Sequence, residues 1–416
     1  MVSALRIRPF GRLLATYTLD EAADWLVGIA LAVFVYERTG SALAVAALLV
    51  SIRFGPSLVL APLAGRLAAR RLGAVLAGLY AGAAVAVLAL AASTAAPLAV
   101  ILLLTFIAST LAATGRVITR TASSNLLDGH GRLRDGIAAL NISAGGVNVL
   151  GPALAGAITV AAGTQASVLV AATVFTGLAI ATWSLQGAAS GADDAGDAGA
   201  PAGVRETLRV LTASPGIAAV LLAAATLLVL FCMDEPILLP YVQDSLSGDT
   251  SHYAVLLTSW GVGLLLGGLT FTLFRGTAML GAFVLAGLLL AGAYLTLGLA
   301  TTLPVAYGAA VVGGMGNGMF WGALNVVTLE AVPPAMRART SGVVESLALA
   351  TPGIGYLLGG GLSEVLSPAS VYLLAGGLGA AVVLALGVSR SRPAARALEA
   401  GTDLSLTASR QVSAST

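Results

Sequence analysis

Long uncharged stretches separated by short charged or polar segments dominate the chain. The three longest cover residues 72–115, 136–192 and 276–329, and each exceeds the roughly 20 residues that one helix needs to cross a bilayer. Each stretch has an internal break, at Ala96-Pro97, at residues 163–165 and at residues 301–304, where proline, glycine and hydroxyl residues suit a tight turn. We therefore predict two membrane-spanning helices in each stretch.

Six further apolar stretches bring the prediction to about twelve transmembrane helices in an all-α integral membrane protein. They cover residues 13–36, 42–64, 215–240, 253–274, 341–362 and 370–388. Hydrophobic residues make up 58% of the 416-residue chain and charged residues only 10%. This composition excludes a soluble enzyme.

A segment made of Gly, Ala, Ser, Asp and Pro, residues 187–203, divides the predicted helices into two six-helix halves. Because this composition cannot bury apolar surface, we predict a flexible cytoplasmic linker over residues 186–212. The two halves then cover residues 13–185 and 213–388. We predict a cytoplasmic N-terminus over residues 1–12 and a disordered cytoplasmic tail over residues 389–416, which is rich in Ser, Thr and Ala.

The placement of the basic residues, all of them arginine, predicts the orientation. Arg38 lies on one side of the predicted membrane and Arg53 inside a helix, whereas all the other arginines fall on the opposite side. Because positively charged loops stay in the cytoplasm, we predict a multi-pass protein of the bacterial cytoplasmic (inner) membrane with both termini cytoplasmic. The absence of lysine also excludes a P-loop and a Schiff base.

Cysteine and histidine content argues against a metal site or another cofactor. Cys232 is the single cysteine, and His130 and His252 are far apart in the sequence. A net charge of +2 does not favour nucleic-acid binding. The partners that we expect are a small-molecule substrate, protons and the lipid bilayer, and we expect a functional monomer.

Five carboxylates fall inside predicted helices, where a charge costs about 2.5 to 3.5 kcal/mol and therefore faces protein or water. They are Asp20, Glu21 and Asp24 in the first helix and Asp234 and Glu235 in the seventh. Asp20 and Asp24 share one helical face with Tyr17, which we predict to line a central cavity. A low-dielectric environment favours the neutral acid, so we predict that Asp24 or Asp20 binds a coupling proton, tuned by Arg53. The alternative is an ion pair of Asp24 with Arg53 that only holds two helices together.

The acidic pair of the seventh helix is followed by Pro236 and Pro240, which kink or loosen a helix. We predict that Asp234 and Glu235 belong to an external gate. The alternative is a helix that ends early and leaves both carboxylates in the external headgroup layer.

Two sets of polar side chains are candidates for a substrate cavity. Asn317, Trp321 and Asn325 in the tenth predicted helix are spaced by four and share one stripe, and Asn141 and Asn148 lie in the fifth. These groups suit the wall of a polar site. Hydrogen bonding between helices is the alternative.

A glycine- and proline-containing motif marks the fifth predicted helix, where residues 146–156 read Gly-Val-Asn-Val-Leu-Gly-Pro-Ala-Leu-Ala-Gly. It resembles the Gly-Pro-x-x-Gly-Gly motif associated with antiporters of the major facilitator superfamily. Over nearly its whole length the chain resembles the twelve-helix, proton-coupled drug and small-molecule exporters of bacteria in that superfamily. The resemblance implies that Gly151 and Pro152 act in gating, with Pro152 bending the helix and the glycines allowing close contact between the halves.

The loop after the second predicted helix is similar to a second signature of this superfamily. Gly65 and Arg70 match it and are further gating candidates, although Ala69 stands where the signature has an aspartate. Many drug exporters carry an arginine midway along the fourth helix. Here we expect Arg116 at the cytoplasmic end of that helix, where its side chain can reach water.

The sequence thus predicts a secondary active transporter of the major facilitator type and not an enzyme. Its predicted activity is proton antiport that exports a small amphiphilic compound, such as a drug, antibiotic or other secondary metabolite, by alternating access. A proton-coupled uptake symporter for a small polar nutrient is one alternative, which Gly151 and Pro152 disfavour. A non-transporting membrane sensor or scaffold is another, although the chain has no sizeable soluble segment.

Overall fold

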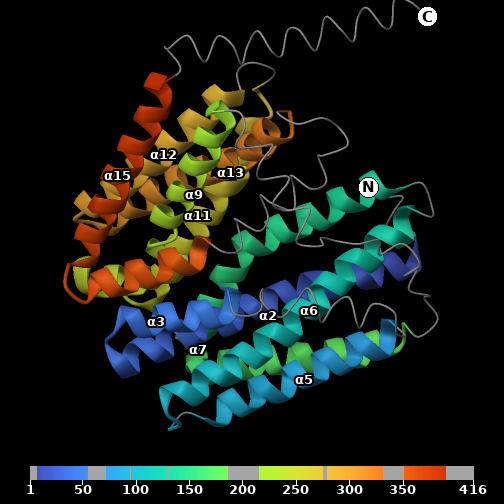
Figure 1. Cartoon of the computed structure of the whole chain (residues 1–416). Helices are drawn as coiled ribbons and strands as arrows, with labels where there is room; N and C mark the ends of the chain where they lie inside the picture. The colour runs from blue at the N-terminus through green and yellow to red at the C-terminus, as the bar shows by residue number, and fades with distance from the viewer. Residues whose placement is uncertain are drawn as a thin grey trace, which may run out of the picture.

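Two groups of helices form the computed structural model of the protein (Figure 1). The structure describes residues 7–54, 72–93, 95–128, 132–185, 215–274, 279–330 and 351–389, and no strand occurs within them. The first group contains α2 (Arg8–Thr39), α3 (Ala42–Leu49) with the π-helical turn η1 (Val50–Phe54), α5 (Leu72–Ala92), α6 (Leu98–Asp128) and α7 (Leu133–Trp183). The second group contains α9 (Pro215–Phe231), α10 (Asp234–Pro240) with the π-helical turn η3 (Tyr241–Ser245), α11 (Thr250–Phe271), α12 (Met279–Leu299), α13 (Leu303–Glu330), a helix over residues 351–363 and α15 (Pro368–Ser389).

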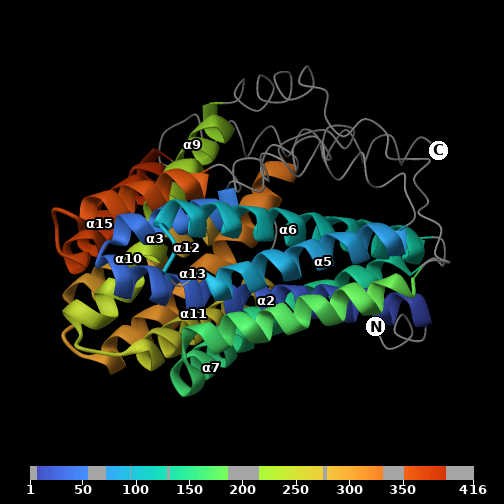
Figure 2. The same cartoon turned by 90° about the horizontal axis from the view of Figure 1, so that it is seen from below.

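Helix α7 reverses direction at Gly163, where the sequence predicted a break. Gly163 has φ 87° and ψ 165°, a backbone conformation that glycine adopts most readily. Both arms of α7 run back from this point toward the same side of the molecule (Figure 2). The predicted breaks at residues 96–97 and 301–304 are also confirmed, because α5 ends at Ala92 before α6 begins and α12 ends at Leu299 before α13 begins.

Six short connections lie at one end of the bundle, which we call the short-turn end. They are residues 40–41, 93–97, 163, 246–249, 300–302 and 364–367. In a chain of spanning helices, alternate connections fall on the same side of the membrane. The described helices of each group therefore cross the bundle in an up-and-down order.

The two groups touch near the short-turn end, where α3 lies against α10 and the helix of residues 351–363 (Figure 1). The first arm of α7 also packs along α11 of the second group (Figure 2). At this contact the Cα of Gly261 faces the backbone of Asn148, and Gly156 faces Ala254. Of the motif glycines that were predicted to allow close contact between the halves, Gly156 does so.

Glycines also bring α11 and α13 together inside the second group. Gly263 and Gly267 on α11 face the backbone of α13, and Gly314 and Gly318 on α13 face the backbone of α11. A side chain at any of these positions would collide with the other helix. Small residues spaced by four are a common means of close helix packing in membranes.

The predicted domain limits remain predictions. The linker over residues 186–212 lies outside the described residues, as does the tail beyond residue 389. Helix α2 begins at Arg8, earlier than the predicted start at residue 13.

Candidate functional site

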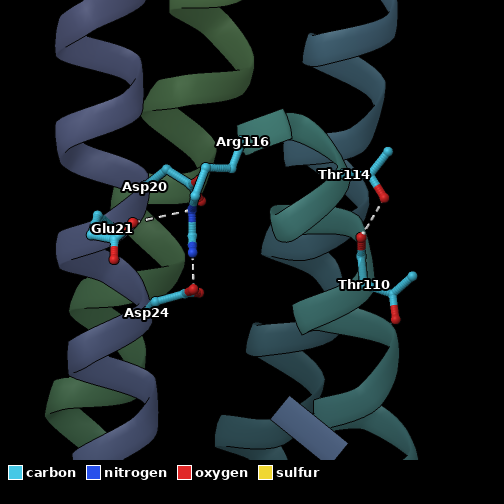
Figure 3. Close-up of polar contacts among 6 residues, drawn as sticks. All are labelled: Asp20, Glu21, Asp24, Thr110, Thr114 and Arg116. Atoms are coloured by element: carbon cyan, nitrogen blue, oxygen red, sulfur yellow. Dashed lines mark hydrogen bonds and ion pairs between the residues drawn. The ribbon is translucent and has the colours of Figure 1, made fainter. Parts of the chain in front are cut away.

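Arg116 of α6 lies among three carboxylates of α2 (Figure 3). Its Nε is 2.9 Å from Asp20 Oδ2 and 3.4 Å from Glu21 Oε2, and its Nη2 contacts Asp24 Oδ2. Asp20 is 0% exposed and Arg116 only 21%. We call these four residues the acidic cluster.

The helical repeat explains how α2 presents the acidic cluster. Asp20 and Asp24 are four residues apart and share one face of α2, as predicted. Both contact the same guanidinium, that of Arg116. Tyr17 lies one turn before Asp20 on α2 and is buried. Tyr80 of α5 is buried beside Gly115, the residue before Arg116.

The expected position of Arg116 at a helix end is wrong. Helix α6 runs from Leu98 to Asp128, so Arg116 lies inside it, about 27 Å from its start at a rise of 1.5 Å per residue. The Thr110 and Thr114 hydroxyls on the preceding turns bond to backbone carbonyls of α6 itself. The sequence prediction placed the end of this helix at Gly115, where the apolar stretch ends. Helix α6 continues beyond that stretch to Asp128, so Arg116 lies inside it.

The acidic cluster carries excess negative charge. Three ionised carboxylates and one guanidinium leave a formal charge of −2, and Oδ1 of Asp20 is buried without a hydrogen-bond partner among the described residues. A buried carboxylate oxygen without a donor is costly. Binding of a proton or another cation would reduce both the charge and this deficit.

Arg53 pairs with Glu235 and not with Asp24, so the alternative of an Asp24–Arg53 ion pair is wrong. Arg53 Nη2 lies 3.2 Å from Glu235 Oε1. Because Arg53 belongs to η1 and Glu235 to α10, this ion pair joins the two helix groups. The sequence could not show it, since the residues are far apart along the chain.

The helix that carries Asp234 and Glu235 is broken, as the nearby prolines predicted. Helix α9 ends at Phe231, α10 begins at Asp234, and η3 follows Pro240. The alternative of a helix that ends early with both carboxylates at its external end is wrong, because α10 and η3 carry the chain on for ten more residues after Glu235, to Ser245. A role of both carboxylates in gating stays a prediction.

The predicted polar stripe on α13 is present, but its members differ in environment. Asn317 and Trp321 are half-buried, whereas Asn325 is exposed and donates through Nδ2 to the Trp321 carbonyl at 2.9 Å. On α7, Asn141 is exposed and Asn148 is half-buried. Their roles as cavity walls stay predictions.

The Gly151-Pro152 motif lies in the first arm of α7, with Pro152 inside the helix. Gly151 faces the ring of Trp25 on α2, within the first group. Contact with the second group is made further along α7, at Gly156. Gly65 and Arg70 lie outside the described residues.

Comparison with solved structures identifies the fold. The nucleoside transporter NupG superposes with a TM-score of 0.72 over 93% of this chain and 100% of that chain, at 15% sequence identity. The chain has the major facilitator fold. A sequence model of the Major Facilitator Superfamily also matches residues 235–413.

Other major facilitator structures are similar to a comparable degree. A bacterial homologue of the human lysosomal transporter Spinster, inward-facing and unoccupied, has a TM-score of 0.65 at 17% identity and covers 91% of this chain and 94% of that chain. A bacterial homologue of the iron transporter ferroportin, inward-facing, has a TM-score of 0.67 at 17% identity and covers 93% and 99%. No curated protein sequence matches this chain significantly.

The major facilitator fold places the chain in a membrane. Among the described residues, seven helices are long and apolar enough to cross one. Together with the fold they indicate a multi-pass membrane protein. Proteins of this fold carry small molecules and are generally not enzymes.

Proposed function

We propose that the protein is a secondary active transporter that exports a small amphiphilic compound, such as a drug, antibiotic or other secondary metabolite, in exchange for protons. The observation that carries this proposal is the acidic cluster, in which Arg116 is shared by Asp20, Glu21 and Asp24. Because excess negative charge inside a membrane is costly, these carboxylates are suited to bind a proton. The mainly apolar helices around it suit an amphiphilic cargo.

Proton exchange at the acidic cluster follows from its contacts. Asp24 contacts one end of the Arg116 guanidinium and is 30% exposed, so a proton can reach it more readily than the fully buried Asp20. Protonation of Asp24 would release the guanidinium nitrogen that it contacts. Arg116 would then shift toward Asp20 and Glu21, which couples proton binding to the packing of α2 against α6.

The orientation that we propose has the short-turn end outside and both termini in the cytoplasm of a bacterium, as the arginine placement predicts. The contact between the helix groups near the short-turn end then closes the external side. Asp234, Glu235, Gly151 and Pro152 are proposed to act when this side opens, and Gly65 and Arg70 at the cytoplasmic side. The protein acts as a monomer in this proposal.

Proton release from acidified inside-out vesicles tests the function. Wild-type protein should release protons when one compound from a panel of amphiphilic antibiotics, dyes and neutral metabolites is added. Asp24→Asn should fold but lose the response, because the amide cannot exchange a proton. Glu37→Gln is the matched control, since Glu37 is an exposed carboxylate of the same helix outside the acidic cluster.

Two results would count against this proposal. Full proton release by Asp24→Asn would remove Asp24 from the mechanism. A folded wild-type protein that responds to no compound, but accumulates a polar nutrient in right-side-out vesicles, would favour the uptake symporter.

A further inference from the structure

The ion pair of Arg53 with Glu235 connects the two helix groups, yet both side chains remain accessible. Arg53 is 49% exposed and Glu235 30%. Three other polar contacts connect the groups among the described residues: Tyr36 donates to Asp244 at 2.6 Å, and Glu364 Oε1 accepts from the Ser41 hydroxyl at 2.6 Å and from the Leu43 amide at 3.4 Å. Those contacts lie at helix ends beside the short turns, so the ion pair is the innermost of these polar contacts.

Irregular helical backbone carries both partners of this ion pair. Arg53 lies in the π-helical turn η1. Glu235 follows the break between α9 and α10, and the second π-helical turn, η3, begins six residues later at Tyr241. Single π-helical turns are rare and occur frequently at functional sites.

Glu235 has an unused hydrogen-bond acceptor. Its Oε1 faces Arg53, and the hydroxyl of Tyr356 lies beside the carboxylate, whereas its Oε2 is buried and makes no well-formed hydrogen bond with the described residues. An ionised carboxylate accepts hydrogen bonds at both oxygens. A ligand that donates several hydrogen bonds would therefore satisfy Glu235 better than the present contact does.

The charges around the ion pair favour a positively charged ligand. The described helices bring five carboxylates into the acidic cluster and the start of α10, against the two guanidiniums of Arg53 and Arg116. Glu21 is close enough to act electrostatically on both arginines. With all groups ionised this region is negative, so it would repel an anion and attract a cation.

We infer that Glu235 binds the ammonium group of a cationic amphiphilic substrate, which replaces Arg53 at this carboxylate. This inference deepens the proposed function, on which it rests, by naming the charge of the substrate. An ammonium has three N–H donors, so once Arg53 has moved aside and uncovered Oε2 it can bond to both carboxylate oxygens, whereas the guanidinium now contacts only Oε1. Its binding breaks the innermost of these polar contacts between the helix groups, and the hydrogen bonds at Tyr36 and Ser41 then remain to be broken before the groups can separate.

Binding of matched probes to purified protein in nanodiscs at pH 7 tests the inference. The probes are 1-adamantylammonium and its neutral isostere 1-adamantanol. Glu235→Gln should weaken binding of the ammonium about tenfold, the loss expected for one charge-assisted hydrogen bond, and leave adamantanol binding unchanged. Arg53→Gln should strengthen ammonium binding, because it removes the competitor, and Glu235→Asp should retain it.

Opposite effects of the two Gln variants separate recognition from structure. Loss of the ion pair alone would change binding in the same direction in both variants and for both probes, and that result would overturn the inference. Glu364→Gln is the control, since it also removes a carboxylate from a contact between the helix groups. Equal weakening of ammonium binding in this control would overturn the inference as well.

The binding result does not depend on the proposed antiport. Correct probe preferences without substrate-triggered proton release would contradict the proposed function and leave the site at Glu235 standing. Proton release by wild-type protein without any preference for the ammonium would support the proposed function and overturn the inference about Glu235.

Discussion

Arg116 shows how much a single cation organises in this molecule. It contacts Asp20, Glu21 and Asp24 on a neighbouring helix, and all four side chains are at least two-thirds buried. Removing one partner of a buried ion pair leaves the remaining charges without compensation. The stability of the α2–α6 contact therefore depends on the guanidinium.

Arg116→Gln should lower the free energy of unfolding by about 3 to 5 kcal/mol, the usual loss when one partner of a buried pair is removed. Thermal unfolding in detergent would measure it. Arg38→Gln is a comparison at an exposed position, where Arg38 donates to the Ala96 carbonyl, and should cost far less. Similar losses in both variants would contradict a special role of the acidic cluster.

Asp249 begins α11 with a reciprocal capping arrangement. Its Oδ1 accepts hydrogen bonds from the Ser251 amide at 2.9 Å and the His252 amide at 3.2 Å, while its own amide donates to His252 Nδ1. Hydrogen bonds from Ser251, and then from His252, lower the pKa of Asp249 from 3.8 to about 2. The ionised carboxylate is therefore the form that stabilises the fold.

This lowered pKa predicts a pH dependence with a definite sign. The stabilisation by Asp249 is fully present above its unfolded pKa of 3.8 and is lost as the pH falls toward 2. Asp249→Ala should cost about 1 kcal/mol at pH 7, a typical value for an N-cap. Asp249→Asn keeps a capping oxygen, so the unfolding temperature of this variant should depend less on pH between 4 and 2 than that of wild type.

At the scale of the helix, close packing of α11 against α13 depends on which face a glycine occupies. Gly267 faces the backbone of Met315, whereas the space around the neighbouring Gly268 is open. Gly267→Ala should destabilise the protein by about 1 to 3 kcal/mol through overpacking. Gly268→Ala should be neutral or slightly stabilising, because alanine favours a helix. Equal unfolding temperatures for the two variants would contradict this packing.

Helix positions followed from the sequence because apolar stretches and their breaks are local properties. The turn at Gly163 and the break before Asp234 were both predicted from glycine and proline. The pairing of charges was not, since Arg53 meets Glu235 and Arg116 meets Asp24 only when the helices pack. How one helix is positioned along another depends on tertiary packing, so it cannot be predicted from the sequence of either helix alone.

At the scale of the whole molecule, the alternating access that we propose requires the contacts near the short-turn end to break. Ser41 and Glu364, which bond across the two helix groups, provide a place to test this. Replacing both by cysteine, with Cys232→Ala to remove the native thiol, would allow a short thiol cross-linker to join the groups. Substrate-triggered proton release should stop after cross-linking and return on cleavage of a reducible linker.

A cross-link inside one helix group is the control for this experiment. Gln165 of α7 donates to the Ala91 carbonyl of α5, so cysteines at these two positions join helices of the same group. Their cross-linking should leave proton release intact. Unimpaired release with the groups joined at positions 41 and 364 would show that this end need not open.

The short connections also have a consequence for digestion by proteases. A protease needs an accessible, extended segment of chain, and exposed loops are the usual sites of cleavage. The short-turn end offers no connection longer than residues 93–97 and turns at a single residue at Gly163. The sequence predicts a long flexible linker, residues 186–212, for the opposite side of the membrane. In sealed vesicles, protection from added protease would therefore show that the short-turn end points outward, without any engineered tag.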